Sequence, residues 1–311
     1  MKIFTYNKFE ICGLKGLTVA LGNFDGLHKG HKKVIELAQP IIKSECFGLI
    51  TFEPHPRQFF SQKSEPFRLM NRTGMVLELK KMGLDVLIEI PFNNEISSLS
   101  AELFVREVLH KYFNLKRLVV GEDFRFGFKR SGDAKLLKNL CDKFGIEAII
   151  AKTVKQDHDE ISSTAIRTAL SDGNLELAEK MLGRRYKMVG KVLEGDKRGR
   201  KLGYPTANLS LEDLKLPKFG VYSAIVEIFS GEYKGKYKSI VSIGNRPTFG
   251  ENKPNLEAHL FDFSGIIYGQ EISIELVDFQ REELKFTNAE HLISQMKEDC
   301  LIAQKKLKYF F

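Results

Sequence analysis

The hydrophobic positions of the first half fall into short apolar runs that alternate with longer segments of helical periodicity. Buried strands are predicted at 17–21, 47–52, 86–90, 117–121 and 146–151. Helices are predicted at about 29–43, 76–82 and 101–112, the last one capped by Ser100. Strands that alternate with helices are typical of parallel βαβ units, so we expect an open, doubly wound α/β sheet.

After about residue 183 the pattern changes to short segments in which apolar and polar residues alternate. These segments are 186–193, 221–229, 238–243, 256–261 and 272–279. Their spacing, with Gly, Pro and Asn between them, predicts a small antiparallel β-barrel. A final helix at about 289–309 has Leu292, Met296, Cys300 and Ala303 at helical spacing, and we expect it to pack on the barrel. A helix is also predicted at 175–182, so the expected domains are 1–183 and 184–311.

Composition narrows the classes of partner. The 311 residues carry a net charge of +8, which the two halves share equally, whereas a nucleic-acid binder usually concentrates basic residues in one patch. This charge favours anionic small molecules over nucleic acid. No apolar run approaches the length of a membrane span, and no secretory signal is visible. Four cysteines without a CxxC pair favour a reducing compartment, so we expect a cytoplasmic location. The oligomeric state stays open.

The strongest local signal is Gly22-Asn-Phe-Asp-Gly-Leu-His-Lys-Gly-His31, which follows the first strand and opens a helix. Glycines let a phosphate approach the backbone, and the N-terminus of the helix attracts negative charge. His28 and His31 are three residues apart, so both can donate hydrogen bonds to phosphoryl oxygens. The string is neither a dinucleotide fingerprint nor a Walker A loop. A zinc site and a purely structural turn remain alternatives.

This string resembles the HxGH nucleotidyltransferase superfamily, and in full it resembles its flavin-adenylylating branch. Three further segments carry the resemblance: Thr51–Arg57 after the second strand, Val119–Asp133 after the fourth, and Ser162–Arg167 at the start of a helix. In parallel sheets, ligands bind at the carboxyl ends of strands, where the first two segments fall. The structural alternatives are a rigid loop, loop packing and a helix cap, respectively.

The resemblance implies a set of site residues for adenylyl transfer. The implied catalytic residues are His28, His31 and Arg167. The implied ATP-binding residues are Gly22, Asn23, Phe24, Asp25, Gly30, Ser162 and Thr164. The implied flavin-binding residues are His55, Asp123, Phe124 and Arg130.

A second motif, Gly195-Asp-Lys-Arg-Gly-Arg-Lys-Leu-Gly-Tyr-Pro-Thr-Ala-Asn208, lies in the second half. Glycines with basic residues can wrap a nucleotide phosphate tail. Thr206 and Asn208 alternate on a predicted short strand, so their side chains share one face. Their neutral oxygens suit Mg²⁺ beside ATP phosphates, which supply the charge. A simple turn is the alternative for Pro205–Asn208.

The second half resembles the riboflavin kinase domain. The matching segments are 217–222, 242–248, 256–263 and 268–269, with Arg281, Glu283 and Phe286 in the late Arg-x-Glu-x-x-Phe element. The resemblance implies that Glu257 is the general base that takes the proton of the ribityl 5′-hydroxyl. The other implied residues are Gly195, Gly199, Arg200, Lys201 and Thr206 for ATP, Thr206 and Asn208 for Mg²⁺, and Arg281 and Phe286 for flavin.

The two resemblances together cover nearly the whole chain, which looks like the bacterial bifunctional riboflavin kinase/FAD synthetase family. They imply an α/β plus β protein: an N-terminal Rossmann-like HxGH nucleotidyltransferase sheet and a C-terminal small antiparallel β-barrel with a closing helix. The implied reactions are riboflavin to FMN and FMN to FAD, each with ATP. Segment Asn71–Met75, Ala165 and Gln280 depart from the usual pattern. A monofunctional adenylyltransferase, a non-catalytic flavin-binding module and an RNA-binding protein are the rivals.

Overall fold

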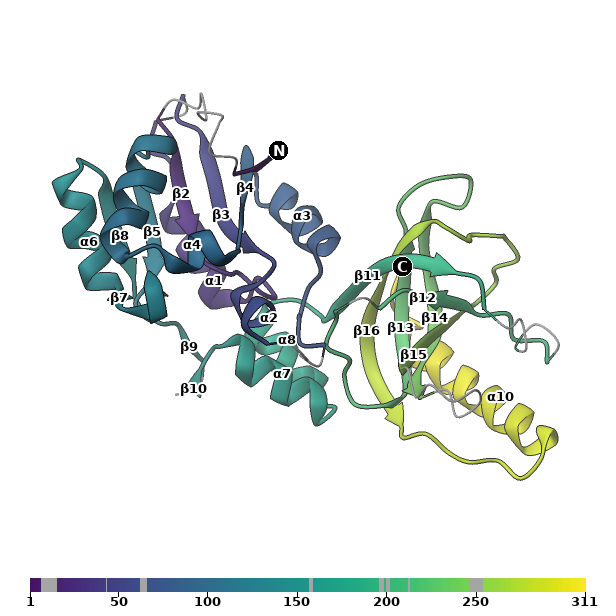
Figure 1. Cartoon of the computed structure of the whole chain (residues 1–311). Coiled ribbons are helices and arrows are strands. Elements are labelled where there is room, and N and C mark those ends of the chain that lie inside the picture. The colour runs from purple at the N-terminus through teal and green to yellow at the C-terminus, as the bar shows by residue number, and fades with distance from the viewer. Residues whose placement is uncertain are drawn as a thin grey trace. The chain divides into compact units, whose positions relative to one another are not determined.

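The computed structural model of the chain describes residues 1–6, 16–42, 44–61, 66–156, 159–195, 199, 202–211, 213–245 and 254–311. It divides into two compact units, Met1–Ser64 with Met75–Ser162, and Glu65–Gly74 with Ser163–Phe311 (Figure 1). The segment 65–74 and the first helices after Ser162 therefore cluster with the C-terminal part of the chain. The functional boundary between residues 183 and 184 stays a prediction.

The first unit is built on a six-stranded parallel sheet in the order β1-β4-β3-β2-β5-β8 (Figure 1). Its strands are β1 (Lys2–Thr5), β2 (Thr18–Leu21), β3 (Phe47–Glu53), β4 (Val86–Pro91), β5 (Arg117–Gly121) and β8 (Glu147–Ala151). The five predicted strands are confirmed. Strand β1 was not predicted because it lies at the sheet edge with exposed side chains, and so lacks a buried apolar run.

The helices of this unit are short. They are α1 (Lys29–Leu37), α2 (Pro56–Phe60), α3 (Arg72–Lys81, which begins in the second unit), α4 (Asn94–Ser98), α5 (Ala101–Leu103), the π-helix η1 (Phe104–Tyr112) and α6 (Ala134–Lys143). Helix α1 ends six residues before the predicted Lys43, because Pro40 restricts the chain just beyond its cap. Ser100 caps the predicted helix as expected: its hydroxyl accepts a hydrogen bond from the Leu103 amide at 3.2 Å.

Small elements complete this unit. The hairpin of β6 (Arg125–Phe126) and β7 (Gly132–Asp133) encloses a 3₁₀ turn, η2 (Phe128–Arg130). A second hairpin pairs β9 (Lys155–Gln156) with β10 (Asp159–Glu160).

The order of the strands creates a switch point between β2 and β5. Successive strands β3 and β4 lie on one side of β2, and β5 and β8 lie on the other. All are parallel, so their carboxyl ends meet at one edge. Doubly wound sheets bind ligands at such a switch point. The loop that leaves β2 begins at Gly22 and occupies this position.

The second unit contains a closed antiparallel barrel in the order β11-β12-β15-β14-β13-β16 (Figure 1). Its strands are β11 (Lys187–Leu193), β12 (Ala207–Leu209), β13 (Gly220–Ile228), β14 (Gly235–Asn245), β15 (Pro254–Leu260) and β16 (Glu271–Arg281). The helices are α7 (Ser163–Ser171), α8 (Leu175–Leu182) and α10 (Ala289–Lys306). The predicted barrel and the predicted helices are confirmed. The three-residue β12 closes the barrel and begins one residue after Thr206.

Helix α10 packs on the barrel as predicted. Ala303 and Leu307 are buried against Ile225 and Phe261, and Cys300 lies beside them. In the part of the chain that the structure describes, no helix is long and apolar enough to cross a membrane.

The segment before α3 belongs to the barrel unit. The Arg68 amide donates to the Asp213 carbonyl at 3.1 Å, and the Lys215 amide donates to the Arg68 carbonyl at 2.7 Å. Asn71, which is buried, donates from Nδ2 to the Val189 carbonyl at 2.8 Å, and its Oδ1 accepts from the Gly74 amide at 3.0 Å. This asparagine, one of the departures from the family pattern, therefore serves as an anchor and a helix cap.

Candidate active sites

The loop after β2 is held in an uncommon backbone conformation. Phe24 and Leu27 have φ of 51° and 44°, with Gly26 at 86° between them. Non-glycine residues reach this region only at a cost of about 1 kcal/mol or more each. Phe24 and Leu27 are both buried, so packing compensates for the cost. Thr51 of β3 also fastens the loop, because its hydroxyl donates to the Asn23 carbonyl at 3.3 Å.

The two histidines of the motif lie against each other. His28 is the N-cap of α1, and its Nδ1 accepts a hydrogen bond from the His31 amide at 3.2 Å. The two rings stack with centroids 3.6 Å apart and planes inclined by 18°. The Phe24 ring meets His31 edge-on at 5.3 Å. The sequence predicted two imidazoles near one helix N-terminus, and the structure brings them into contact.

His31 is set up to stay neutral. Burial, and then the proximity of His28, hold the pKa of His31 well below its ordinary value. Its Nδ1 is among the few buried side-chain polar atoms of the described residues without a hydrogen-bond partner. Gly30 lets the His28 ring lie close to the backbone of α1, because a Cβ at position 30 would lie only 3.1 Å from that ring. A neutral imidazole still donates one hydrogen bond, which suits an anionic oxygen.

Asp25 of the motif is also buried, whereas Asn23 is exposed. Gly22 extends the pairing of β2 with β3, since its amide donates a hydrogen bond to the Ile50 carbonyl at 3.1 Å. The seven motif residues expected at this site, from Gly22 to His31, therefore lie on one loop and one helical turn.

His55 follows β3 and caps α2. Its Nδ1 accepts from the Arg57 amide at 3.0 Å, and the Gln58 side chain accepts from the His55 amide at 3.3 Å. One ring nitrogen of His55 therefore helps to cap α2, which agrees with the alternative that His55 is a residue of a rigid loop. The flavin-binding role of His55 stays a prediction.

A chain of aromatic rings runs from α2 to β6. Phe92 touches Phe59 and Phe60 edge-on at 5.3 and 5.7 Å, and Phe52 links Phe92 to Phe104. Phe126 continues the chain from Phe104. Phe60 is 69% exposed. Sequence reasoning missed Phe59, Phe60 and Phe92, because they come from different elements and carry no motif.

The loop after β5 carries the other predicted flavin residues. Phe124 stacks on Phe126 with centroids 5.7 Å apart, whereas Asp123 and Arg130 are exposed. Lys129 and Arg130 have φ of 51° and 60°. The residues of this loop share one unit with the histidine pair, at the carboxyl edge of the sheet.

Arg167 lies in the second unit, on α7. Its Nε donates to the Phe67 carbonyl at 2.6 Å, and its guanidinium carbon lies 5.3 Å from the centre of the Phe67 ring. Helix α7 begins at Ser163, directly after Ser162, and Thr164 is exposed in its first turn. The role of Arg167 in adenylyl transfer stays a prediction.

In the barrel, Glu257 is held by two donors. The hydroxyl of Thr206 donates to Oε2 at 3.2 Å, and Nδ2 of Asn255 donates to Oε1 at 2.7 Å. Strand register explains why Thr206 lies close to Glu257, because Glu257 on β15 is paired with Asn208 on the neighbouring β12. The structure brings together Thr206, Asn208 and Glu257, which the sequence singled out. It adds Asn255, which carries no motif signal and is found only through its contact.

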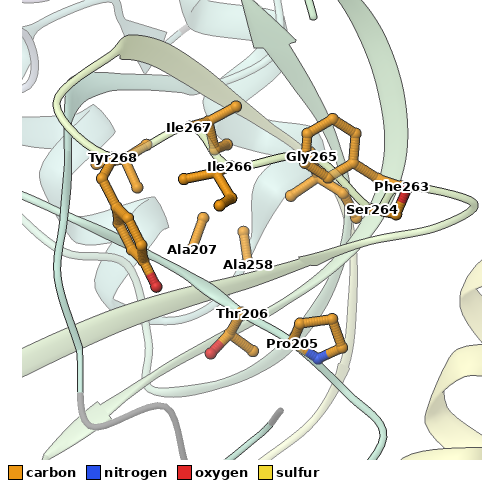
Figure 2. A pocket seen from close by; sticks show the side chains of 12 residues that line it. Pro205, Thr206, Ala207, Ala258, Phe263, Ser264, Gly265, Ile266, Ile267 and Tyr268 are labelled. Atoms are coloured by element: carbon orange, nitrogen blue, oxygen red, sulfur yellow. The ribbon is translucent and has the colours of Figure 1, made fainter.

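A pocket of about 290 Å³ opens beside Thr206. Figure 2 shows Phe263 and Tyr268 on opposite sides of it, with Pro205 and Thr206 along one margin. The lining is mostly apolar, with Ala207, Ala258, Leu260, Ile266 and Ile267. Thr206 is shared: it lines the pocket and donates to Glu257.

Two glycines of the second motif, Gly195 and Gly199, allow close contacts with other parts of the motif. A Cβ on Gly199 would lie 2.3 Å from the Tyr204 carbonyl, whose amide in turn donates to the Gly199 carbonyl at 2.8 Å. A Cβ on Gly195 would lie 2.3 Å from Nδ2 of Asn208. Arg200 and Lys201, predicted to bind ATP, lie outside the described residues.

Arg281 ends β16, and its guanidinium faces α10. Its Nε and one Nη donate to the two carboxylate oxygens of Asp299 at 2.9 and 2.6 Å, and the other Nη donates to the Glu282 carbonyl at 2.8 Å. Phe286 is half-buried in the segment that follows. The predicted flavin contact of Arg281 is not tested, and its engagement with Asp299 was not anticipated.

Comparisons with known proteins agree with this architecture. The FAD synthetase family model matches residues 13–165, and the riboflavin kinase family model matches residues 182–307. The bifunctional riboflavin kinase/FMN adenylyltransferases of Haemophilus influenzae and Escherichia coli are 36% and 34% identical to this chain over 94% of its length, covering 94% and 93% of theirs. A crystal structure described as a macrolide-efflux protein from Streptococcus pneumoniae has a TM-score of 0.83 and 32% identity, covering 97% of this chain and 98% of that one. This chain therefore belongs to the family of bifunctional riboflavin kinase/FMN adenylyltransferases.

Proposed function

We propose that this chain converts riboflavin to FMN in the domain 184–311, which contains the barrel, and FMN to FAD in the domain 1–183, which contains the parallel sheet, with one ATP consumed in each step. The observation that carries the proposal is the presence of two chemically different constellations on one chain. One is a stacked pair of imidazoles at a helix N-terminus, and the other is a carboxylate that accepts a hydrogen bond from Thr206, a residue that also lines a pocket.

In the kinase step, Glu257 accepts the proton of the ribityl 5′-hydroxyl as that oxygen attacks the γ-phosphorus of ATP. The bond from this phosphorus to the bridging oxygen breaks, and ADP leaves. Thr206 and Asn255 each occupy one carboxylate oxygen, which fixes the orientation of Glu257. Positioning of this kind is what phosphoryl transfer mainly requires, together with charge neutralisation.

The residues around Glu257 fit Mg²⁺. Thr206 and Asn208 offer neutral oxygens near one carboxylate, and the described residues hold no group of three His, Cys, Asp or Glu that could form a protein-only cage. Mg²⁺ prefers oxygen ligands and is usually held partly by substrate phosphates. When bound, it neutralises charge on the phosphate oxygens.

The pocket beside Thr206 takes the adenosine part of the ATP used by the kinase. Its largely apolar lining with two aromatic side chains suits a purine, and its volume of about 290 Å³ is of the order of a small ligand. Gly195, Gly199, Arg200 and Lys201 then wrap the phosphates.

In the adenylylation step, a phosphate oxygen of FMN attacks the α-phosphorus of ATP, and pyrophosphate leaves. This phosphate is already ionised at neutral pH, so the site needs hydrogen-bond donors rather than a strong base. His28, His31 and Arg167 supply them. The other ATP contacts are Gly22, Asn23, Phe24, Asp25, Gly30, Ser162 and Thr164.

FMN lies along the aromatic chain at the carboxyl edge of the sheet. The exposed ring of Phe60 near one end of this chain, and Phe124, which stacks on Phe126 at the other end, offer faces for an isoalloxazine. His55, Asp123 and Arg130 contact its polar groups.

Residues 1–183 and 184–311 are the two functional domains in this proposal, with family models that end at 165 and begin at 182 in support. A cytoplasmic location is supported by the free thiols of Cys46, Cys141 and Cys300. Burial raises the pKa of Cys141 to about 12 and that of Cys300 to about 11, so both stay protonated and unreactive.

The test is a chromatographic assay of riboflavin with Mg-ATP for the wild type, His28→Ala, His28→Asn and Glu257→Gln. Both His28 variants should produce FMN but lose FAD formation by at least about 100-fold, because an anion donor is removed. Asn restores the helix cap, so only Ala should also lower the melting temperature. Glu257→Gln should form FAD only from supplied FMN. Loss of both activities in every variant would contradict the two-site proposal.

The same assay separates the rival functions. A monofunctional adenylyltransferase would make FAD from FMN but no FMN from riboflavin. A flavin-binding module would bind flavin without consuming ATP.

A further inference from the structure

The end of β16 is fastened to α10 by one buried ion pair. Arg281 and Asp299 form a two-point contact, with N···O distances of 2.9 and 2.6 Å. Asp299 is 3% exposed, and Nε2 of Gln295 donates to its Oδ1 at 3.0 Å. Burying a carboxylate this deeply is costly unless it is paired, so the pair has a demanding geometry.

The Arg281 guanidinium donates hydrogen bonds to two different partners. Besides Asp299, it donates to the Glu282 carbonyl at 2.8 Å, so it fixes the first peptide after the strand. Glu282 in turn pairs with Lys218 at 2.6 Å, and the Lys218 ammonium lies 5.4 Å from the centre of the Phe279 ring. The first residues of segment 281–286, which ends at Phe286, are thus held both by α10 and by Lys218, which lies two residues before β13.

A second ion pair joins the same two elements without touching this segment. Lys306 of α10 lies 3.4 Å from Asp278 of β16, and the Lys306 side chain is exposed. The two pairs differ in what they hold. Arg281–Asp299 fixes the last residue of β16, whereas Lys306–Asp278 joins α10 to β16 three residues before that end.

We propose that Asp299 is a positioning residue of the riboflavin kinase site, which acts through Arg281 to hold segment 281–286 in the conformation that receives riboflavin. This inference rests on the proposed function, in which Arg281 and Phe286 contact the flavin. A carboxylate fork opposite a guanidinium fork specifies both distance and plane. Without it, the segment must be ordered by riboflavin itself, and this ordering lowers affinity.

The experiment compares the full-length wild type with Asp299→Asn and with the matched control Asp278→Asn. For Asp299→Asn we expect the KM for riboflavin to rise about 10-fold to 100-fold, because one hydrogen bond to a charged group is lost. The KM for ATP and the conversion of supplied FMN to FAD should change less than about twofold, a difference of under ~0.5 kcal/mol. Asp278→Asn should leave all three values near those of the wild type.

Direct binding gives a readout that does not depend on turnover. Quenching of riboflavin fluorescence, measured with Mg-ADP present, should show the same rise in Kd for Asp299→Asn. A wild type that binds riboflavin but makes no FMN would contradict the proposed function. Equal riboflavin Kd values for the wild type and Asp299→Asn would contradict the inference about Asp299.

Two further variants separate positioning from general destabilisation. Asp299→Glu keeps the charge and should recover part of the riboflavin affinity, even if Asp299→Asn melts too low to assay. Because Asp299 acts through Arg281, the double variant Arg281→Gln/Asp299→Asn should bind riboflavin no more weakly than Arg281→Gln alone. Additive losses, or equal rises in KM for riboflavin and ATP, would overturn the proposal.

Discussion

The two candidate sites of this chain use opposite chemistry. At the carboxyl edge of the parallel sheet, a pair of imidazoles stacks at the N-terminus of α1. In the barrel, a carboxylate receives hydrogen bonds from Thr206 and Asn255. The difference follows the protonation state of the nucleophile in the proposed reactions. A phosphate that is already ionised needs donors, whereas a neutral hydroxyl needs an acceptor for its proton.

The sites also differ in how the backbone supports them. The histidine loop depends on left-handed residues held by burial, so its shape comes from packing beneath it. Glu257 depends on strand register, which sets it opposite Asn208. The histidine loop should therefore be sensitive to substitutions that remove packing, and the Glu257 site should be sensitive to substitutions that remove hydrogen bonds.

The effect expected at Asn255 is smaller than the loss of at least about 100-fold expected for the His28 variants, but it is the largest of the three that follow, and it tests the carboxylate site. Asn255→Leu removes the 2.7 Å donor to Glu257, and kcat of riboflavin phosphorylation should fall about 10-fold to 100-fold, as for a hydrogen bond to a charged group. Conversion of supplied FMN to FAD, measured in parallel, is the internal control. An equal fall in both rates would contradict the separation of the two sites.

A stability change of intermediate size is expected at Asn71 and tests the second unit. Asn71→Ala leaves the Val189 carbonyl and the Gly74 amide without their partner, which should cost about 1–3 kcal/mol of unfolding free energy. Urea titration measures the change. The control is Asn93→Ala, which removes an exposed helix cap at α4 and should cost only about 1 kcal/mol. Equal losses would argue against a special anchoring role for Asn71.

The smallest effect is a pH dependence that tests the first unit. The pKa of His31 is lower in the folded than in the unfolded chain, so the unfolded chain binds more protons below pH 6.5. Stability is therefore complete above about pH 6.5 and is lost as the pH falls toward the folded pKa. Between about pH 7 and pH 5.5 the wild type should lose about 1 kcal/mol more than His31→Gln. Parallel curves for the two proteins would contradict the burial of a neutral imidazole.

The sequence alone determined the fold class, most elements and the motif-bearing residues of both sites. Periodicity was enough for the sheet and the barrel, because buried strands require apolar runs and half-buried strands require alternation. Strand β1 escaped prediction, since an exposed edge strand has no apolar signature. The early end of α1 was missed because its predicted length followed periodicity past Pro40.

Only the tertiary structure decided which side chains meet. The contacts of Thr206 with Glu257 and of Arg281 with Asp299 join residues that are 51 and 18 positions apart, and strand pairing or helix packing creates them. The same holds for Asn71 and Val189, which are 118 positions apart. A local pattern records periodicity and short motifs, but a contact between distant residues depends on how the chain returns to the same place. For that reason the sequence predicted both candidate sites, and the fold supplied the contacts that hold their residues in position.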